Sequence, residues 1–81
     1  MNMHNARWTS LAVADVLHSS GRTIRSVAEE TEIPYSTLRR KLASESAFTL
    51  SELYLLAGCL GVTPSRFLRP DSRAPVDAGG R

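Results

Sequence analysis

Apolar residues in the first part of the chain recur at helical spacing. Val13 and Leu17 lie four positions apart, and Leu11 and Ala14 occupy adjoining positions, which together give a broad apolar face. This pattern predicts a first helix over residues 9–20.

Residues 23–42 are predicted to form two short helices joined by a tight turn. Thr23 has a side chain suited to the N-cap of a second helix, which should end near Thr31 or Glu32. A third helix begins near Pro34, because the missing N–H of proline is tolerated in a first turn. The residues expected to face inward are Ile24, Val27, Ala28 and Thr31 in the second helix, Ile33 in the turn, and Leu38 and Leu42 in the third helix.

A fourth helix has the clearest start signal in the sequence. After a polar loop over residues 43–48, Thr49 and Glu52 have the spacing of a capping box, and Phe48 and Leu53 that of a hydrophobic staple. The inward stripe then consists of Leu53, Leu56, Ala57 and Leu60.

A short fifth helix is predicted directly after Gly61. Thr63 is in a cap position, Val62 can pack on Phe67, and the helix should stop by Pro70. No strand pattern competes anywhere in the chain. The expected fold is therefore all-α, a compact bundle of four to five short helices with Trp8 and Phe67 in its core.

Length and composition limit the organisation and the chemistry. Eighty-one residues allow one small domain, here residues 8–69, with an N-terminal arm over 1–7 and a disordered tail over 70–81 that is rich in Pro, Gly and Ala. No apolar run is long enough for a membrane span, and Cys59 has no partner for an internal disulfide, so a cytoplasmic location is expected. His4 and His18 are far apart. They also lack a nearby Cys or acid at ligand spacing, so we expect no metal site. No arrangement of Ser, His and Asp suggests a catalytic triad, and we expect no catalysis, cofactor or small-molecule ligand.

The positive charge is concentrated in one segment. The chain has a formal net charge of +2, and the whole excess lies in residues 22–41, where five basic residues stand against three acidic ones. The third helix carries Arg39, Arg40 and Lys41 without an acid. This asymmetry suits a polyanionic partner, although a solvated helix face would have the same composition.

Two halves of the chain together resemble the phage repressor and Cro (XRE-like) family of helix-turn-helix proteins. The similarity covers roughly residues 8–68 and is carried by VAEETEIPYSTLRRKL followed by LSELYLLAGCLGVTPSRFL. Glu32 stands where the family commonly has glycine in the turn, and Ile24 where it often has glutamine. The resemblance implies a lambda-repressor-like bundle that recognises an operator in double-stranded DNA and controls transcription in a bacterial host cell.

The resemblance also implies where DNA is contacted. Tyr35, Ser36 and Arg40 match positions that meet base edges, and Arg39 can reach a base or a phosphate. Arginine presents a planar fork that matches guanine. Helix N-termini and hydroxyl or basic side chains hold phosphates. The expected phosphate contacts are Thr23, Arg25, Thr37, Lys41, Ser44 and Ser46.

Three further interpretations remain open from the sequence. Leu55, with Tyr54 and Cys59, lies opposite the inward stripe of the fourth helix and could form a homodimer interface. The chain could be an antitoxin-like regulator or the headpiece of a longer repressor. It could also be a helical protein-interaction module that does not bind DNA, with Tyr54 and Leu55 at its centre.

Overall fold

All regular secondary structure in the described part of the chain is helical. The computed structural model describes the backbone of residues 3–68 and the side chains of residues 7–68. In order, the elements are α1 (Met3–Ser20), α2 (Ile24–Thr31), α3 (Tyr35–Leu42), α4 (Leu50–Leu60) and the 3-10 helix η1 (Pro64–Phe67). The predicted all-α bundle of four to five short helices is confirmed. The predicted tail over residues 70–81 lies outside the described residues.

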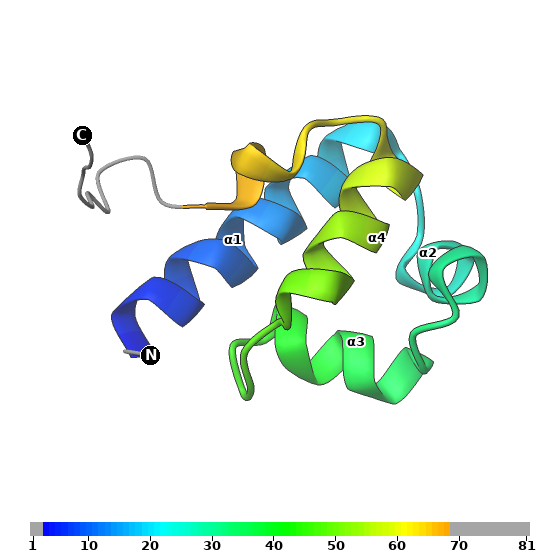
Figure 1. Ribbon diagram of the computed structural model, residues 1–81. Coiled ribbons are helices and arrows are strands. Elements are labelled where there is room, and N and C mark those ends of the chain that lie inside the picture. Colours follow the sequence, from blue (N-terminus) through cyan, green and yellow to red (C-terminus); the bar gives the residue numbers. More distant parts are fainter. Residues whose placement is uncertain (1–2, 69–81) are drawn as a thin grey trace.

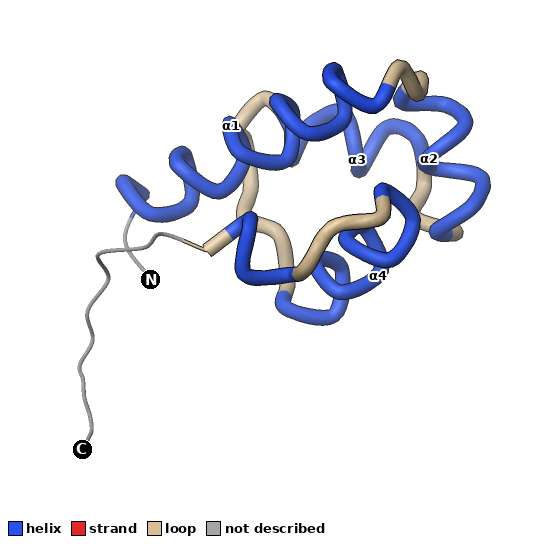
Figure 2. The backbone as a smooth tube through the Cα atoms, turned by 90° about the horizontal axis from the view of Figure 1, so that it is seen from above, coloured by secondary structure: helices blue, strands red, loops and turns tan. Residues whose placement is uncertain are grey.

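The helices pack around a common centre. α1 contacts α3, α4 and η1, while α2 packs on α3 and α4. α3 lies across one end of the bundle, and the N-terminal half of α1 extends beyond the other helices (Figure 1). Seen from above, helices surround the middle of the molecule (Figure 2), which buried side chains fill.

The core takes side chains from every element. Each fully buried aliphatic or aromatic side chain contributes roughly 1.5–3 kcal/mol through removal of its surface from water. The buried apolar residues are Val13, Val16, Leu17, Val27, Ala28, Ile33, Leu38, Phe48, Leu53, Leu56, Ala57 and Phe67. Most of the predicted inward positions of the second to fourth helices are among them.

α1 departs from the prediction in three ways. It begins at Met3 and not near residue 9, so residues 3–7 are helical where an arm was expected. Leu11 is 59% exposed, because its position is about 200° around the helix from Val13. Trp8 is half-buried at the surface and is not in the core.

The turn between α2 and α3 is formed as the sequence predicts. The Thr23 hydroxyl accepts a hydrogen bond from the Ser26 N–H at 3.0 Å, which caps α2. Glu32 ends α2 in the left-handed conformation, with φ of 64°. Such a φ at a residue other than glycine costs of order 1 kcal/mol, which the buried Ile33 beside it helps to offset.

The start of α4 is confirmed in detail. Thr49 and Glu52 form both hydrogen bonds of the capping box. The helix ends at Gly61, whose φ of 75° favours glycine. Thr63 precedes η1 in the N-cap position, but its hydroxyl contacts Ser65 Oγ at 3.0 Å and makes no cap bond.

The helices of the described segment range from four residues in η1 to 18 residues in α1. None of them combines the length and the apolar character that a membrane crossing requires.

Candidate functional site

The outward face of α3 gathers the polar side chains that the sequence predicts to contact bases. Ser36, Arg39 and Arg40 are exposed, and with Tyr35 they line one shallow groove. On the opposite side of the same helix, Leu38 is only 1% exposed and anchors α3 in the core. The anchoring fixes which side of α3 meets solvent, so these four side chains are held on a common surface.

Tyr35 joins α2 to this surface. The guanidinium carbon of Arg25 lies 4.5 Å from the centre of the Tyr35 ring, and that of Arg39 lies 6.0 Å from it. Both distances are within the range of a cation–π interaction. The ring therefore holds one arginine from each helix of the pair, a role that the sequence did not reveal.

Lys41 is directed away from this groove. Its ammonium donates hydrogen bonds to both carboxylate oxygens of Glu52, at 2.7 and 2.9 Å. The two side chains are 13% and 19% exposed. The predicted phosphate contact of Lys41 does not fit this geometry, because its charge is already paired where α3 meets α4.

Glu52 is the centre of that junction. Its carboxylate also accepts the backbone N–H of Thr49 at 2.8 Å. Burial on its own would raise the pKa of Glu52, but the hydrogen bonds from Lys41 and Thr49 and the charge of Lys41 outweigh it and hold the pKa below its ordinary value of 4.5.

Ser10 completes the support of α3 and was missed by sequence reasoning. It is fully buried, and its hydroxyl donates to the Lys41 carbonyl at 2.7 Å. The bond ties α1 to the last turn of α3. A serine one turn before Val13 on the apolar face of α1 was the available signal.

The excess charge of residues 22–41 is smaller at the surface than in the sequence. Arg22 pairs with Glu30 at 2.7 Å, and this hydrogen bond lowers the pKa of the Glu30 carboxyl. With Arg22 and Lys41 both paired, the basic residues of this segment that make no ion pair among the described residues are Arg25, Arg39 and Arg40.

Acidic side chains border the same surface. Glu45 lines the groove on α3, and Glu29 and Glu32 line a neighbouring hollow together with Arg25 and Tyr35. The face therefore has mixed charge, because each of the two hollows is lined by both arginine and carboxylate side chains.

The remaining predicted phosphate contacts differ in accessibility. Thr23 is exposed, although its hydroxyl accepts the cap bond of α2. Thr37, Ser44 and Ser46 are half-buried. Ser44 also has a positive φ of 66°, and its N–H donates to the Lys41 carbonyl at 3.0 Å, which places it in the turn that ends α3.

The predicted dimer surface on α4 divides into two parts. Tyr54 and Leu55 are both well exposed. Cys59 is half-buried beside Arg22, whose guanidinium approaches the Cys59 carbonyl at 3.4 Å, and burial raises the pKa of its thiol. Tyr54 and Leu55 therefore form an exposed pair without Cys59.

No group of three or more His, Cys, Asp or Glu side chains within the described residues is placed to hold a metal ion. A search of protein-family models, curated proteins and solved structures finds no match to this chain. The function is therefore inferred from the geometry of α2 and α3.

Proposed function

We propose that this chain is a sequence-specific regulator that binds double-stranded DNA with α3 in the major groove. One observation carries the proposal: Ser36, Arg39 and Arg40 share an exposed face of a short helix whose other face is anchored by Leu38. A major groove about 12 Å wide admits a helix of this kind. The turn from α2 to α3 leaves the N-terminal end of α3 exposed, which is the end that enters the groove in such complexes.

The base-reading side chains have different capacities. Arg40 is exposed and unpaired within the described residues, so its fork is available to O6 and N7 of a guanine. Ser36 can donate or accept and discriminates weakly. Arg39 lies beside the Tyr35 ring and can reach a base or a phosphate. In this scheme Tyr35 mainly orients two arginines.

Phosphate contacts come from the edge of α2. Arg25 stacks on Tyr35 and so lies beside α3, where a guanidinium can neutralise the DNA backbone. Thr23 stands at the N-terminus of α2, an end that favours anions. Thr37, Ser44 and Ser46 remain candidates as hydroxyl donors, whereas Lys41 is assigned to the fold.

Regulation then follows from occupancy of a site. A protein bound at an operator blocks or recruits other proteins there. Whether transcription falls or rises depends on the position of the operator. An antitoxin-like regulator or the headpiece of a longer repressor would use the same contacts.

Selection of bound duplexes from a random DNA pool, followed by titration at several salt concentrations, tests the proposal. We expect one enriched motif containing guanine and an affinity that falls steeply with salt, because bound arginines release counterions. Arg40→Ala should reduce specific binding by about 1–3 kcal/mol and relax preference at one base pair. Arg7→Ala is the matched control, since Arg7 is exposed on α1 and outside the groove on α3.

The proposal is wrong if Arg39→Ala and Arg40→Ala both leave DNA affinity at the level of the Arg7→Ala control. A pool without enrichment at low salt would have the same meaning.

A protein-interaction module is the second candidate, favoured by the exposed Tyr54 and Leu55 on α4. It predicts that Leu55→Glu abolishes the protein's activity in cells while Arg40→Ala has no effect. The DNA-binding proposal predicts the reverse order of effects.

A further inference from the structure

A second apolar surface lies between α1 and η1, away from α3. It is a shallow groove of about 540 Å³, open to solvent. Leu11 is 59% exposed there and Leu68 is 45% exposed. The apolar residues that line it are Trp8, Leu11, Ala12 and Val16 from α1 and Leu68 after η1. Exposed apolar side chains gathered along a groove in this way suit an interaction site.

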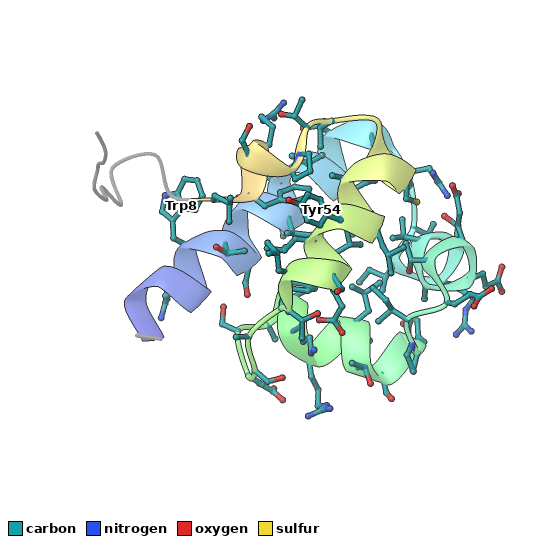
Figure 3. The ribbon with its side chains drawn as sticks, in the orientation of Figure 1. Trp8 and Tyr54 are labelled. Atoms are coloured by element: carbon teal, nitrogen blue, oxygen red, sulfur yellow. The ribbon has the colours of Figure 1, made fainter. Side chains whose placement is uncertain are left out.

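Trp8 stands at the outer end of this groove. Figure 3 shows it on the part of α1 that extends past the bundle. A half-buried tryptophan offers a large apolar area with few rotatable bonds, which is why tryptophan is enriched among residues that dominate binding energy.

The groove carries one charge of each sign. Asp15 lies on the α1 side and Arg66 on the η1 side, and both are exposed. Neither belongs to an ion pair within residues 7–68. A surface with an apolar middle and two opposite charges on facing walls is complementary to itself, because a two-fold axis brings each charge opposite its counterpart on the other copy.

We propose that this groove binds the same groove of a second copy of the chain, forming a two-fold symmetric dimer. Leu11, Leu68 and Trp8 supply the apolar contact. Asp15 of each copy pairs with Arg66 of the other, which fixes the register. The surface is distinct from the Tyr54–Leu55 pair on α4, and association through it needs no DNA. The proposed dimer can therefore be tested independently of the DNA binding proposed above.

Sedimentation equilibrium of the full chain over micromolar to millimolar concentrations, without DNA, tests the proposal. We expect a monomer–dimer equilibrium that Leu11→Glu weakens at least about tenfold, because a carboxylate replaces an apolar contact at the middle of the interface. Leu55→Glu makes the same change on the rival surface of α4, and it should leave the equilibrium unchanged.

Charge reversal makes the test specific for the register. Asp15→Arg and Arg66→Asp should each weaken self-association, since like charges then face each other. An equimolar mixture of the two variants should associate again, because each then meets an opposite charge on its partner. Both side chains are exposed, so each variant should fold, and circular dichroism of each variant checks this.

Three outcomes overturn the inference. They are a wild-type chain that stays monomeric at millimolar concentration, a dimer that survives Leu11→Glu, and a dimer lost in Leu55→Glu alone. Failure of the mixture to associate while both single variants are weakened would overturn the proposed pairing of Asp15 with Arg66.

Discussion

The outward face of α3 and its junction with α4 use neighbouring basic residues in opposite ways. On the outward face, Arg39 and Arg40 are exposed and make no ion pair with any described residue. At the junction, Lys41 is mostly buried, bound to Glu52 and joined through its carbonyl to Ser10. Successive residues on a helix point about 100° apart, so one step along the chain separates a solvent-facing charge from a structural one.

This difference shows that a run of like charges is not a single functional unit. Arginine at the exposed positions keeps its fork free for a planar acceptor, whereas the compact ammonium of Lys41 suits a paired position beside a capping carboxylate. Changes at the junction should therefore affect the free energy of unfolding, whereas changes on the outward face should affect the proposed binding of DNA.

The largest effect on the free energy of unfolding is expected at the junction of α3 with α4. Lys41→Met keeps an unbranched side chain, shorter by one atom, but leaves Glu52 partly buried without its counter-charge. We expect the free energy of unfolding to fall by about 2 kcal/mol, between the values for exposed and fully buried pairs. Urea unfolding measures it, and Arg40→Met is the control, with an expected change within about 0.5 kcal/mol. Equal losses for both variants would remove the distinction between the two surfaces.

Part of that stability should depend on pH. The folded protein holds the pKa of Glu52 below 4.5, so the unfolded chain binds the proton more readily and the contribution is complete only above pH 4.5. It is lost as the pH falls from 4.5 through the lower pKa of the folded state. Urea unfolding from pH 7 to pH 3 should show a smaller acid-induced loss for Glu52→Gln than for the wild type. If the unfolding free energies of the two proteins fell equally with pH, the charged form of Glu52 would not be stabilised as the structure indicates.

The Ser10 bond gives the next effect. Ser10→Ala removes a buried hydroxyl donor, while the Lys41 carbonyl keeps the Ser44 N–H. We expect a loss of about 1 kcal/mol in unfolding free energy. Ser36→Ala, the same change on the exposed face, should stay within about 0.5 kcal/mol. A neutral Ser10→Ala would show that this bond does not hold α1 against α3.

On the outward face, two substitutions of Tyr35 distinguish a role in orienting arginines from a direct contact of its hydroxyl with DNA. Tyr35→Phe keeps the aromatic ring, whereas Tyr35→Leu removes the cation–π interaction with Arg25 and Arg39. If the chain binds DNA as proposed, Leu should weaken it by about 0.5–1 kcal/mol and Phe by much less. Fluorescence anisotropy with a selected duplex measures both. Equal losses would assign the effect to the phenolic hydroxyl.

The smallest effect is expected from Glu45 at the border of the groove. Glu45→Gln removes a carboxylate that repels phosphates, so DNA affinity should rise by a few tenths of a kcal/mol at low salt. The gain should vanish at high salt because the repulsion is screened. A gain that persists at high salt would point to a direct contact of the glutamine amide with DNA.

Local signals predicted most of the fold. Capping residues such as Thr23 and Thr49 act within one turn of the chain, and their hydrogen bonds form as expected. The apolar spacing from Val27 to Leu56 also identifies the buried faces. α1 was less well predicted, because a serine is at a core position and Leu11 and Trp8 lie at the surface.

The candidate site was predicted in part. The sequence identified Tyr35, Ser36, Arg39 and Arg40, and the structure brings them to one groove. It could not reveal the stack of Arg25 on Tyr35, nor the pairing of Lys41 with Glu52, because both join residues of different helices.

The sequence by itself determined α2, α3 and α4, their ends and the side of each that is buried, because these depend on contacts a few residues apart. Only the tertiary structure decided which charges remain exposed. The position of α4 against α3 pairs Lys41 with Glu52, and the packing of α1 on η1 leaves Leu11, Trp8 and Leu68 along an open groove. Those outcomes depend on the approach of distant segments, which local spacing does not encode.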